Sequence, residues 1–480
     1  MNYPYVFRTL GKVSLLLAAL LVLPLVVAGI YQEEDLYLAF ILPIMLLFIF
    51  GISLVAFIKP KKSRIYAKEG VFIVSLTWLL MSVIGALPFV ISRDIPNFFD
   101  ALFEIVSGFT ATGFSTANNI EALSRSILFW RGFSNWIGGM GVIVFFLAFF
   151  PKLNNARSMY ILRAESPGHQ VDKMVSKMKL STRIIYIIYI VLTIICILLL
   201  WIGGMPLFDS IVHGFATAGT GGFSVKNLSI AAYHRPDIEN VIAVFMLLFG
   251  VNFNIYYLIL VGQMKKGILS EELRWYIGIV TISILLITFN ILHLYGHLAD
   301  ALRLATFQVS TVITTTGFST ADFSMWPAFS QSILLILFFI GGMAGSTSGG
   351  MKVSRIVLLW KLLKREIYGL LHPNEVKIIN FEKRPIEERI MKQVGAFMAG
   401  YLLIILFSTI ILSLEVNSLL TSFTTSLSLL SNVGLAFDPS LSFSALSNGM
   451  KAFLSLIMIT GRLELFPIFI LFNPRIWNKV

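Results

Sequence analysis

The sequence predicts an all-α integral membrane protein in which four pseudosymmetric units surround one central pore, with an additional N-terminal two-helix hairpin. Two observations predict this fold. The chain of 480 residues is 57% hydrophobic and only 13% charged, with a mean hydropathy of +0.85, and apolar runs long enough to cross a bilayer recur along it. A short apolar segment followed by a glycine-containing turn also recurs between these runs.

Composition excludes several classes of protein. About a quarter of the residues in an ordinary soluble domain are charged, so this chain lacks the charge for a water-facing shell. We therefore exclude a soluble enzyme, a secreted disulfide scaffold and a disordered protein. The net charge of +12 indicates basic cytoplasmic loops rather than nucleic-acid binding. The single cysteine, Cys196, lies in an apolar run and is expected to be a small buried hydrophobic residue.

The first 60 residues form the predicted hairpin. Its apolar runs, Val13–Ile30 and Leu36–Ile58, are separated by an acidic turn and followed by a basic stretch. Because Arg8 and Lys12 precede the first run, a signal peptide is the alternative interpretation of that run. Further long spans are predicted near residues 71–91, 126–150, 184–202, 238–261, 275–294, 330–363, 394–414 and 444–472.

These later spans group into four predicted pore repeats, which follow the hairpin of residues 1–60. Each repeat contains a span, a short apolar helix too brief to cross the membrane, a glycine-containing turn and a second span. The predicted repeats are residues 70–155, 180–265, 272–366, whose second span is interrupted, and 392–480.

The charge of the connections predicts the orientation. Lys and Arg concentrate in 59–70, 152–183, 265–274 and 352–392, whereas 32–35, 92–100, 117–125 and 319–329 are acidic or neutral. With both termini in the cytoplasm, every basic connection falls on the cytoplasmic side, as the positive-inside rule requires. The long basic loops are also compatible with binding to anionic lipid or to a soluble partner.

The internal repeat is the most specific signal in the sequence. Phe99–Phe103 leads to Thr110-Ala-Thr-Gly-Phe-Ser-Thr116, and Phe208–Val212 leads to Gly219-Thr-Gly-Gly-Phe-Ser224. A third copy ends in Thr314-Thr-Thr-Gly-Phe-Ser-Thr320, and a weaker fourth copy contains Ser431-Asn-Val-Gly434. We refer to the shared glycines as the turn glycines; they are Gly113, Gly222, Gly317 and Gly434.

The chemistry of this repeat favours a cation. Irregular backbone at membrane depth is tolerated only where it is buried in protein or lines a water-filled cavity. Four short helices that point their C-terminal ends at one axis favour positive charge there, and carbonyls from four turns can replace the hydration shell of an alkali ion. The alternative is that each turn is a re-entrant turn or a helix C-cap without a ligand.

These motifs resemble the TrkH/TrkG and KtrB superfamily of potassium-uptake proteins, which includes the plant HKT transporters. The resemblance extends over the chain and includes Gly341–Lys352 and Gly461–Pro467. It implies potassium uptake through a gated, potassium-preferring pore in a bacterial-type cytoplasmic (inner) membrane. It also implies a homodimer gated by a cytoplasmic TrkA-type ring that binds a nucleotide, NAD or ATP/ADP, while this chain binds no organic cofactor.

The resemblance assigns the selectivity filter to the four turns, and the turn glycines go with potassium preference. Two departures stand out: Gly221 occupies the place of Thr112 and Thr316, and the fourth turn reads Val-Gly-Leu-Ala. We expect looser selectivity from these departures. The predicted K⁺ ligands are the backbone carbonyls of Thr112, Thr220, Thr316 and Asn432. The predicted filter comprises Thr110, Ala111, Thr112, Gly113, Gly219, Thr220, Gly221, Gly222, Thr314, Thr315, Thr316, Gly317, Ser431, Asn432, Val433 and Gly434.

The third repeat carries the predicted gate. Gly341–Gly350 contains five glycines and three hydroxyl residues, which makes a continuous helix improbable. The resemblance implies a loop that blocks the pathway below the filter. Close helix packing through small residues is the alternative, and a phosphate-binding loop is a poorer interpretation because the motif lacks Lys-Ser/Thr and a preceding strand. The gate residues implied are Gly345, Ser346, Thr347, Ser348, Gly349, Lys352 and Arg462.

Charged residues inside apolar segments need a partner or a function. The resemblance places Arg462 near the gating loop, and an Arg462–Glu464 ion pair is the alternative, although residues i and i+2 do not share a helix face. Lys352 is also compatible with a snorkelling residue at a helix end. Arg131 receives no assignment from sequence. Of the residues on the short helices, Glu104 is interpreted as a complement to the helix dipole, and His213 as a hydrogen-bonded structural residue.

Two rival functions remain at this point. A potassium symporter coupled to protons or sodium would need an ion-binding or titratable site on the pathway, and the sequence offers no clear intramembrane carboxylate pair. An intramembrane enzyme is disfavoured because the histidines are scattered, and His293 and His297 lack a third ligand. The sequence therefore predicts an ion channel or transporter and no enzyme.

Overall fold

The longest apolar runs of the sequence form the longest helices of the computed structural model, which describes residues 1–59, 67–141, 178–375, 377–438 and 440–471. Within these residues, six helices are long and apolar enough to cross a membrane, and a bent pair adds a seventh span if it is counted as one. The six are α1 (Tyr3–Ile30), α2 (Tyr37–Phe57), α3 (Ala67–Ser92), α8 (Met178–Ile202), α13 (Glu271–Tyr295) and α17 (Glu388–Leu412).

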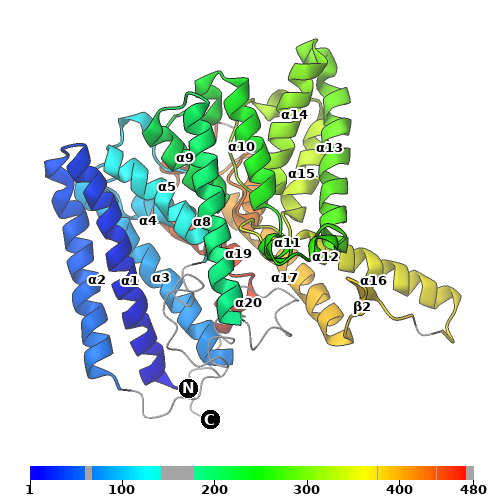
Figure 1. Cartoon of the computed structure of the whole chain (residues 1–480), viewed down its shortest axis with the longest axis horizontal. Helices are drawn as coiled ribbons and strands as arrows, with labels where there is room; N and C mark the ends of the chain where they lie inside the picture. Colours follow the sequence, from blue (N-terminus) through cyan, green and yellow to red (C-terminus); the bar gives the residue numbers. More distant parts are fainter. Residues whose placement is uncertain (60–66, 142–177, 376, 439, 472–480) are drawn as a thin grey trace.

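The first two helices form the predicted hairpin at one side of the molecule, and the short 3₁₀ helix η1 (Glu34–Leu36) joins them (Figure 1). Their backbones approach closely at two glycines, since a Cβ on Gly11 would lie 2.9 Å from the carbonyl oxygen of Gly51. Small residues permit such contacts between membrane helices. Helix α1 also packs against α3 and against α5 (Arg125–Met140), so the hairpin is joined to the first repeat.

The remaining helices form four units of the predicted kind. Each unit has an outer helix, a short pore helix and an inner helix, with a 3₁₀ turn between the last two. The outer helices are α3, α8, α13 and α17. The pore helices are α4 (Phe98–Phe109), α9 (Leu207–Gly219), α14 (Leu298–Ile313) and α18 (Leu419–Ser431). The inner helices are α5, α10 (Pro236–Phe249), α15 (Ala328–Ile340) and α19 (Asn448–Arg462). The 3₁₀ turns are η2 (Ile120–Ala122), η4 (Ser229–Tyr233), η5 (Phe323–Met325) and η6 (Phe443–Ala445).

Helix packing closes the four units into a ring. The inner helix of each unit packs against the pore helix of the next: α5 against α9, α10 against α14, α15 against α18, and α19 against α4. The last contact joins the fourth unit to the first, so the order is cyclic. This arrangement confirms the predicted all-α fold of four pseudosymmetric units.

The structure corrects two of the predicted inner spans, which are broken into two helices each. The expected span 238–261 consists of α10 and α11 (Phe253–Leu260), bent by 85°. The expected span 444–472 consists of α19 and α20 (Phe466–Leu471), separated by Glu464 and Leu465 with positive φ values. Helix α5 ends at Met140, its C-cap residue Gly141 has a φ of 78°, and the rest of the expected span 126–150 lies outside the described residues. These breaks place irregular backbone beneath the pore helices.

The third inner span is interrupted as predicted. Helix α15 ends at Ile340 and α16 (Val353–Leu371) begins after a break, so we refer to residues 341–352 as the interrupting segment. A two-stranded hairpin, β1 (Asn380–Phe381) paired with β2 (Arg384–Pro385), follows α16 and leads into α17. Figure 1 shows α16 and the start of α17 projecting from one side of the bundle. The short helix α12 (Met264–Ile268) connects the second and third units. Parts of the basic connections 59–70 and 152–183, and the predicted boundary at 155, lie outside the described residues.

Candidate functional site

The four pore helices end in the same way. One residue at each C-terminus adopts the left-handed conformation, and the next N–H group bonds back to a carbonyl in the last turn of the helix, at 2.8–2.9 Å. Such a cap satisfies helix carbonyls and turns the chain sharply. The left-handed residues are Ala111 (φ 54°), Thr220 (52°), Thr315 (54°) and Asn432 (56°).

The turn glycines follow two residues later and form a closed ring. Their φ values are +97°, +66°, +88° and +76° in chain order, a region that side chains disfavour. A Cβ on Gly113 would meet the Gly221 carbonyl oxygen at 2.6 Å, and one on Gly222 would meet that of Thr316 at 2.1 Å. The series continues from Gly317 to Val433 at 2.4 Å and returns from Gly434 to Thr112 at 1.8 Å. Each turn therefore touches the next, and all four surround one axis.

This ring shows that the four predicted carbonyl ligands occupy two different positions along the turns. Thr112 and Thr316 directly precede their turn glycines, but Thr220 and Asn432 lie one position earlier and are the left-handed cap residues. The equivalent carbonyls in the second and fourth turns are those of Gly221 and Val433. We refer to the carbonyls of Thr112, Gly221, Thr316 and Val433 as the carbonyl ring. The prediction spans two positions because the second turn contains two adjacent glycines and the fourth lacks the repeated threonine.

Side chains behind the ring differ between alternate turns. The hydroxyls of Thr110 and Thr112 lie 2.7 Å apart in the first turn, and those of Thr314 and Thr316 lie 2.8 Å apart in the third. In the second turn, a Cβ on Gly221 would lie 2.5 Å from the side-chain amide carbon of the buried Asn135. Asn135 of the neighbouring inner helix thus fills the space that a threonine would need, which explains this departure from the repeat.

The fourth turn is joined to the first through its cap residue. The Asn432 amide donates to the Thr112 hydroxyl at 2.9 Å and to the Met458 carbonyl of α19 at 3.0 Å. Asparagine tolerates the left-handed conformation better than most residues. The fourth turn therefore keeps the backbone path of the others, although it has Val433 where the first and third have threonine.

The interrupting segment contacts the pore helix of its own unit and both neighbouring units near the ring. The Gly349 N–H donates to the Thr315 hydroxyl at 2.6 Å, and the Gly350 N–H donates to the Ser431 carbonyl at 2.9 Å. The Met343 N–H donates to the carbonyl of Gly250, where the second inner span breaks, at 3.0 Å. A helix would run past these groups, so the glycines place backbone across the ends of the pore helices instead.

Arg462 joins this segment to the first unit. Its guanidinium donates to the Thr347 carbonyl at 2.8 Å and to the carbonyls of Gly138 and Gly139 at 2.5 and 2.7 Å. Lys352, which is 9% exposed, donates from Nζ to the Ser348 carbonyl at 2.5 Å. Two predicted gate residues therefore place positive charge at the segment. The Glu464 carboxylate pairs with Arg355 of α16.

Glu272 is a functional candidate that the sequence interpretation missed. Its carboxylate accepts from the Ala344 N–H at 2.7 Å and from the Ser354 N–H at 3.2 Å, so it holds both ends of the interrupting segment. Glu272 is 2% exposed and lies in the first turn of α13. In sequence, a glutamate after Ser270 resembles an ordinary helix start. The signal available in the sequence was a carboxylate so close to an apolar span.

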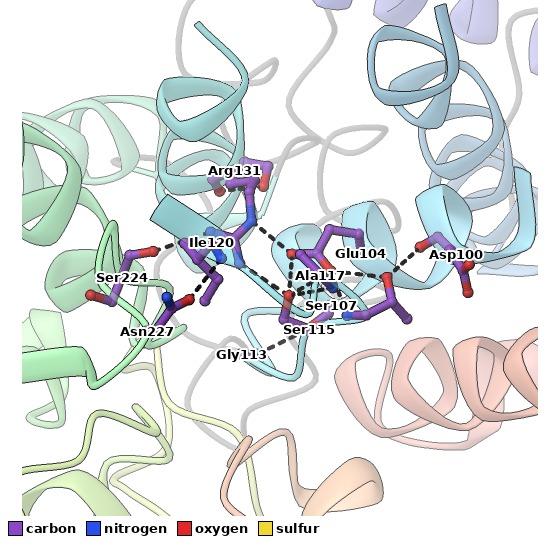
Figure 2. A network of polar contacts seen from close by, with 12 residues as sticks. Asp100, Glu104, Ser107, Gly113, Ser115, Ala117, Ile120, Arg131, Ser224 and Asn227 are labelled. Carbon is purple, nitrogen blue, oxygen red and sulfur yellow. Dashed lines mark hydrogen bonds and ion pairs between the residues drawn. The ribbon is translucent and has the colours of Figure 1, made fainter. Parts of the chain in front are cut away.

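A second polar network lies beside the first two turns (Figure 2). Arg131 of α5 donates from Nε to Glu104 of α4 at 2.7 Å, and their side chains are 1% and 0% exposed. Glu104 also accepts from the Thr116 N–H at 2.8 Å. The dipole interpretation of Glu104 is therefore incomplete, since this carboxylate fixes the chain beyond the turn. His213 is a structural residue as predicted, because its ring bonds to the Asp209 carbonyl and the Ser224 hydroxyl.

The described residues contain no group of three or more His, Cys, Asp or Glu side chains placed to hold a metal ion. His293 and His297 thus gain no third ligand within that part of the chain. Backbone carbonyls suit alkali ions better than transition metals. K⁺ as permeating ion would be cargo rather than a resident cofactor.

A ring of re-entrant helices with glycine turns and converging carbonyls, enclosed by apolar helices, defines a multi-pass membrane protein that transports cations. Comparison with known families agrees. The model of the TrkH family, described as cation transport protein, matches residues 38–479, and the chain belongs to this family. A family of transporters also argues against the enzyme interpretation.

Individual relatives match over the full length. The chain is 35% identical to the Trk system potassium uptake protein TrkH of Salmonella typhimurium, with 100% of both chains covered. It is 34% identical to the Trk system potassium uptake protein TrkG of Escherichia coli, with 95% of both covered. The crystal structure of the potassium transporter TrkH from Vibrio parahaemolyticus superposes with a TM-score of 0.90 at 31% identity, covering 100% of both chains.

Proposed function

We propose that this protein takes up potassium across the bacterial cytoplasmic membrane through a gated pore that prefers K⁺ to Na⁺. The closed ring of turn glycines is the observation that carries the proposal, because it brings one backbone carbonyl of each turn against a neighbouring turn. The names of the full-length relatives support potassium as the ion.

The carbonyl ring supplies the first set of K⁺ ligands in this proposal. The carbonyls of the four cap residues, Ala111, Thr220, Thr315 and Asn432, form a second set one position earlier along each turn. Two stacked sets allow an ion to leave one site as the next ion enters, which conduction requires. The unequal side chains behind the turns lead us to expect weaker selectivity than a ring of four identical turns would give.

The interrupting segment is the gate in this proposal. Its contacts with Thr315 and Ser431 place it next to the ends of two pore helices. Arg462 adds a guanidinium that repels cations, and its bond to Thr347 ties that charge to the segment. Opening would move the segment away from the axis and separate it from Arg462.

Cellular context completes the proposal. Both termini lie in the cytoplasm, the protein forms a homodimer, and a TrkA-type ring that binds NAD or ATP/ADP regulates the gate. The basic segments support this orientation, and the projecting region of α16 and the β1–β2 hairpin offers a cytoplasmic surface for such a ring.

Uptake by the purified protein in liposomes tests the function. We expect ⁸⁶Rb⁺ uptake that external K⁺ inhibits more strongly than Na⁺ does. Equal inhibition by both ions would refute the potassium preference. A reversal potential that shifts with an imposed proton or sodium gradient would favour the alternative, a symporter, whereas one that follows only the K⁺ gradient supports a pore.

A further inference from the structure

We infer that Arg131 is a positioning residue of the ion filter, which locks the first two turns to each other and thereby contributes to ion selectivity. This inference rests on the proposed function. It concerns a buried side chain that contacts both turns without belonging to the turn motif.

Each pore helix has one side chain in the same register, nine residues before the turn glycine. These residues are Glu104, His213, Gln308 and Thr425, and each is at most 1% exposed. In the first two units this side chain reaches the serine two residues beyond the turn glycine. Glu104 accepts from the Ser115 hydroxyl at 3.0 Å, and the His213 ring contacts the Ser224 hydroxyl at 3.0 Å.

The third and fourth units differ at this register. Within the described part of the chain, the amide of Gln308 and the hydroxyl of Thr425 have no hydrogen-bond partner. The fourth unit also has Ala436 where the first and second have serine. Polar bracing of the turns is therefore concentrated in one half of the ring.

Arg131 connects the two braced turns (Figure 2). While its Nε bonds to Glu104, one terminal nitrogen donates to the Ser224 carbonyl at 3.1 Å, and the other lies 3.4 Å from the Ser115 hydroxyl. The guanidinium carbon also lies 4.2 Å from the centroid of the Phe223 ring, directly after the second turn glycine. A planar group with several fixed donors can make all these contacts together, which a lysine ammonium cannot.

The geometry distinguishes this role from simple helix packing. An ion pair that only joined α4 to α5 would need the Glu104 contact alone. Instead, the remaining donors and the face of the guanidinium are directed to residues 223–224, on the chain beyond the second turn. A shift of that segment relative to Ser115 would move Gly221 and Gly113, whose backbones are in contact. Arg131 therefore fixes the separation of two adjacent members of the carbonyl ring.

The test removes the link without leaving a buried charge. Losing one partner of a buried ion pair is strongly destabilising, whereas replacing both with residues of similar size is often tolerated. In Glu104→Gln/Arg131→Met, the new side-chain amide at position 104 can still accept from the Thr116 N–H, but nothing reaches Ser224. We expect the purified variant to insert and transport Rb⁺, with relative Na⁺ permeability raised about tenfold, the effect of losing one charge-assisted contact on an equilibrium ratio.

The matched control is Glu239→Gln/Arg303→Met. This pair joins α10 to the pore helix α14 at 2.9 Å, on the helices rather than on the turns. We expect a lower melting temperature but an unchanged Na⁺ to K⁺ permeability ratio. The same shift in both double variants would show that general loosening of the bundle, and not the link, controls selectivity, and would overturn the inference.

Arg131→Lys is a second test of the inference if Glu104→Gln/Arg131→Met does not insert into the membrane. It retains the buried charge and a contact to Glu104 but loses the simultaneous contacts to Ser224 and Phe223, so its relative Na⁺ permeability should also rise. An unchanged permeability ratio in either inserted variant would overturn the inference. Absence of K⁺ preference in the parent protein would instead refute the proposed function itself.

Discussion

Alanine substitutions at the four turn glycines should reduce potassium transport to different degrees. A Cβ on Gly434 would lie 1.8 Å from the Thr112 carbonyl oxygen, whereas real Cβ contacts begin near 3.0 Å. The carbonyl must therefore retreat by about 1.2 Å, and the same comparison gives about 0.9 Å for Gly222, 0.6 Å for Gly317 and 0.4 Å for Gly113. We expect the loss of K⁺ flux to follow this order.

The size of the effect follows from geometry. A left-handed residue other than glycine costs about 1–2 kcal/mol, and this strain is shared by all four variants because each φ is positive. The displacement of the carbonyl differs between them. By analogy with catalytic groups, where a 1 Å misplacement costs on the order of 100-fold, Gly434→Ala should lose most of its K⁺ flux and Gly113→Ala the least.

The assay is initial ⁸⁶Rb⁺ uptake into liposomes, normalised to correctly inserted protein. Gly449→Ala in α19 is the matched control, because a Cβ there meets nothing within 4 Å, and it should transport like the parent. Equal losses at all four positions would mean that backbone strain alone determines flux. A Gly434→Ala variant with normal flux would refute the assignment of these carbonyls to the ion pathway.

The remaining predictions concern the filter and the gate. Gly113→Ser should raise Na⁺ permeability relative to K⁺, because it adds a side chain at the least obstructed turn; a reversal-potential measurement in mixed salt checks this. Deleting part of residues 343–349 should raise Rb⁺ uptake without a regulator, and lower uptake by an inserted variant would favour a packing role. Arg462→Gln should also raise regulator-free uptake, by removing a positive charge bonded to Thr347. Glu272→Gln should do so more weakly, since an amide oxygen still accepts from the Ala344 N–H but without a full charge.

The helices, the repeat and the turn glycines could be predicted from local sequence, because periodicity and spacing are properties of neighbouring residues. Contacts between units could not be predicted in this way. That Thr220 and Asn432 lie one position earlier than Thr112 and Thr316 could be recognised only from which carbonyl faces the next glycine. The break at Gly250 was missed although Gly250 and the N-cap residue Asn252 mark it, because the mean hydropathy of the surrounding residues is high and does not respond to a bend of 85°.

The partners of the charged residues could not be predicted from local sequence either. Arg131 received no assignment because its partners lie 27 residues before it and 93 residues after it. Glu272 contacts the interrupting segment across 72 residues. The resemblance to a family placed Arg462 near the gate, but only the structure identifies the Thr347 carbonyl as its partner. Long-range polar partners thus require the fold, even where the fold itself is predictable.

The contacts of the interrupting segment also set a limit on the free energy that a regulator must supply to open the pore. The bonds Arg462–Thr347 and Glu272–Ala344 join the segment to other helices, and each involves a charged group. Such bonds contribute about 1.5–3 kcal/mol each, so breaking both costs about 3–6 kcal/mol. Shifting a two-state equilibrium from about 1% to about 99% open requires about 5.5 kcal/mol. Opening also breaks the segment's hydrogen bonds to Thr315, Ser431 and Gly250, so a regulator must supply at least this much free energy, and one that leaves the two charged bonds intact would have little effect on the pore.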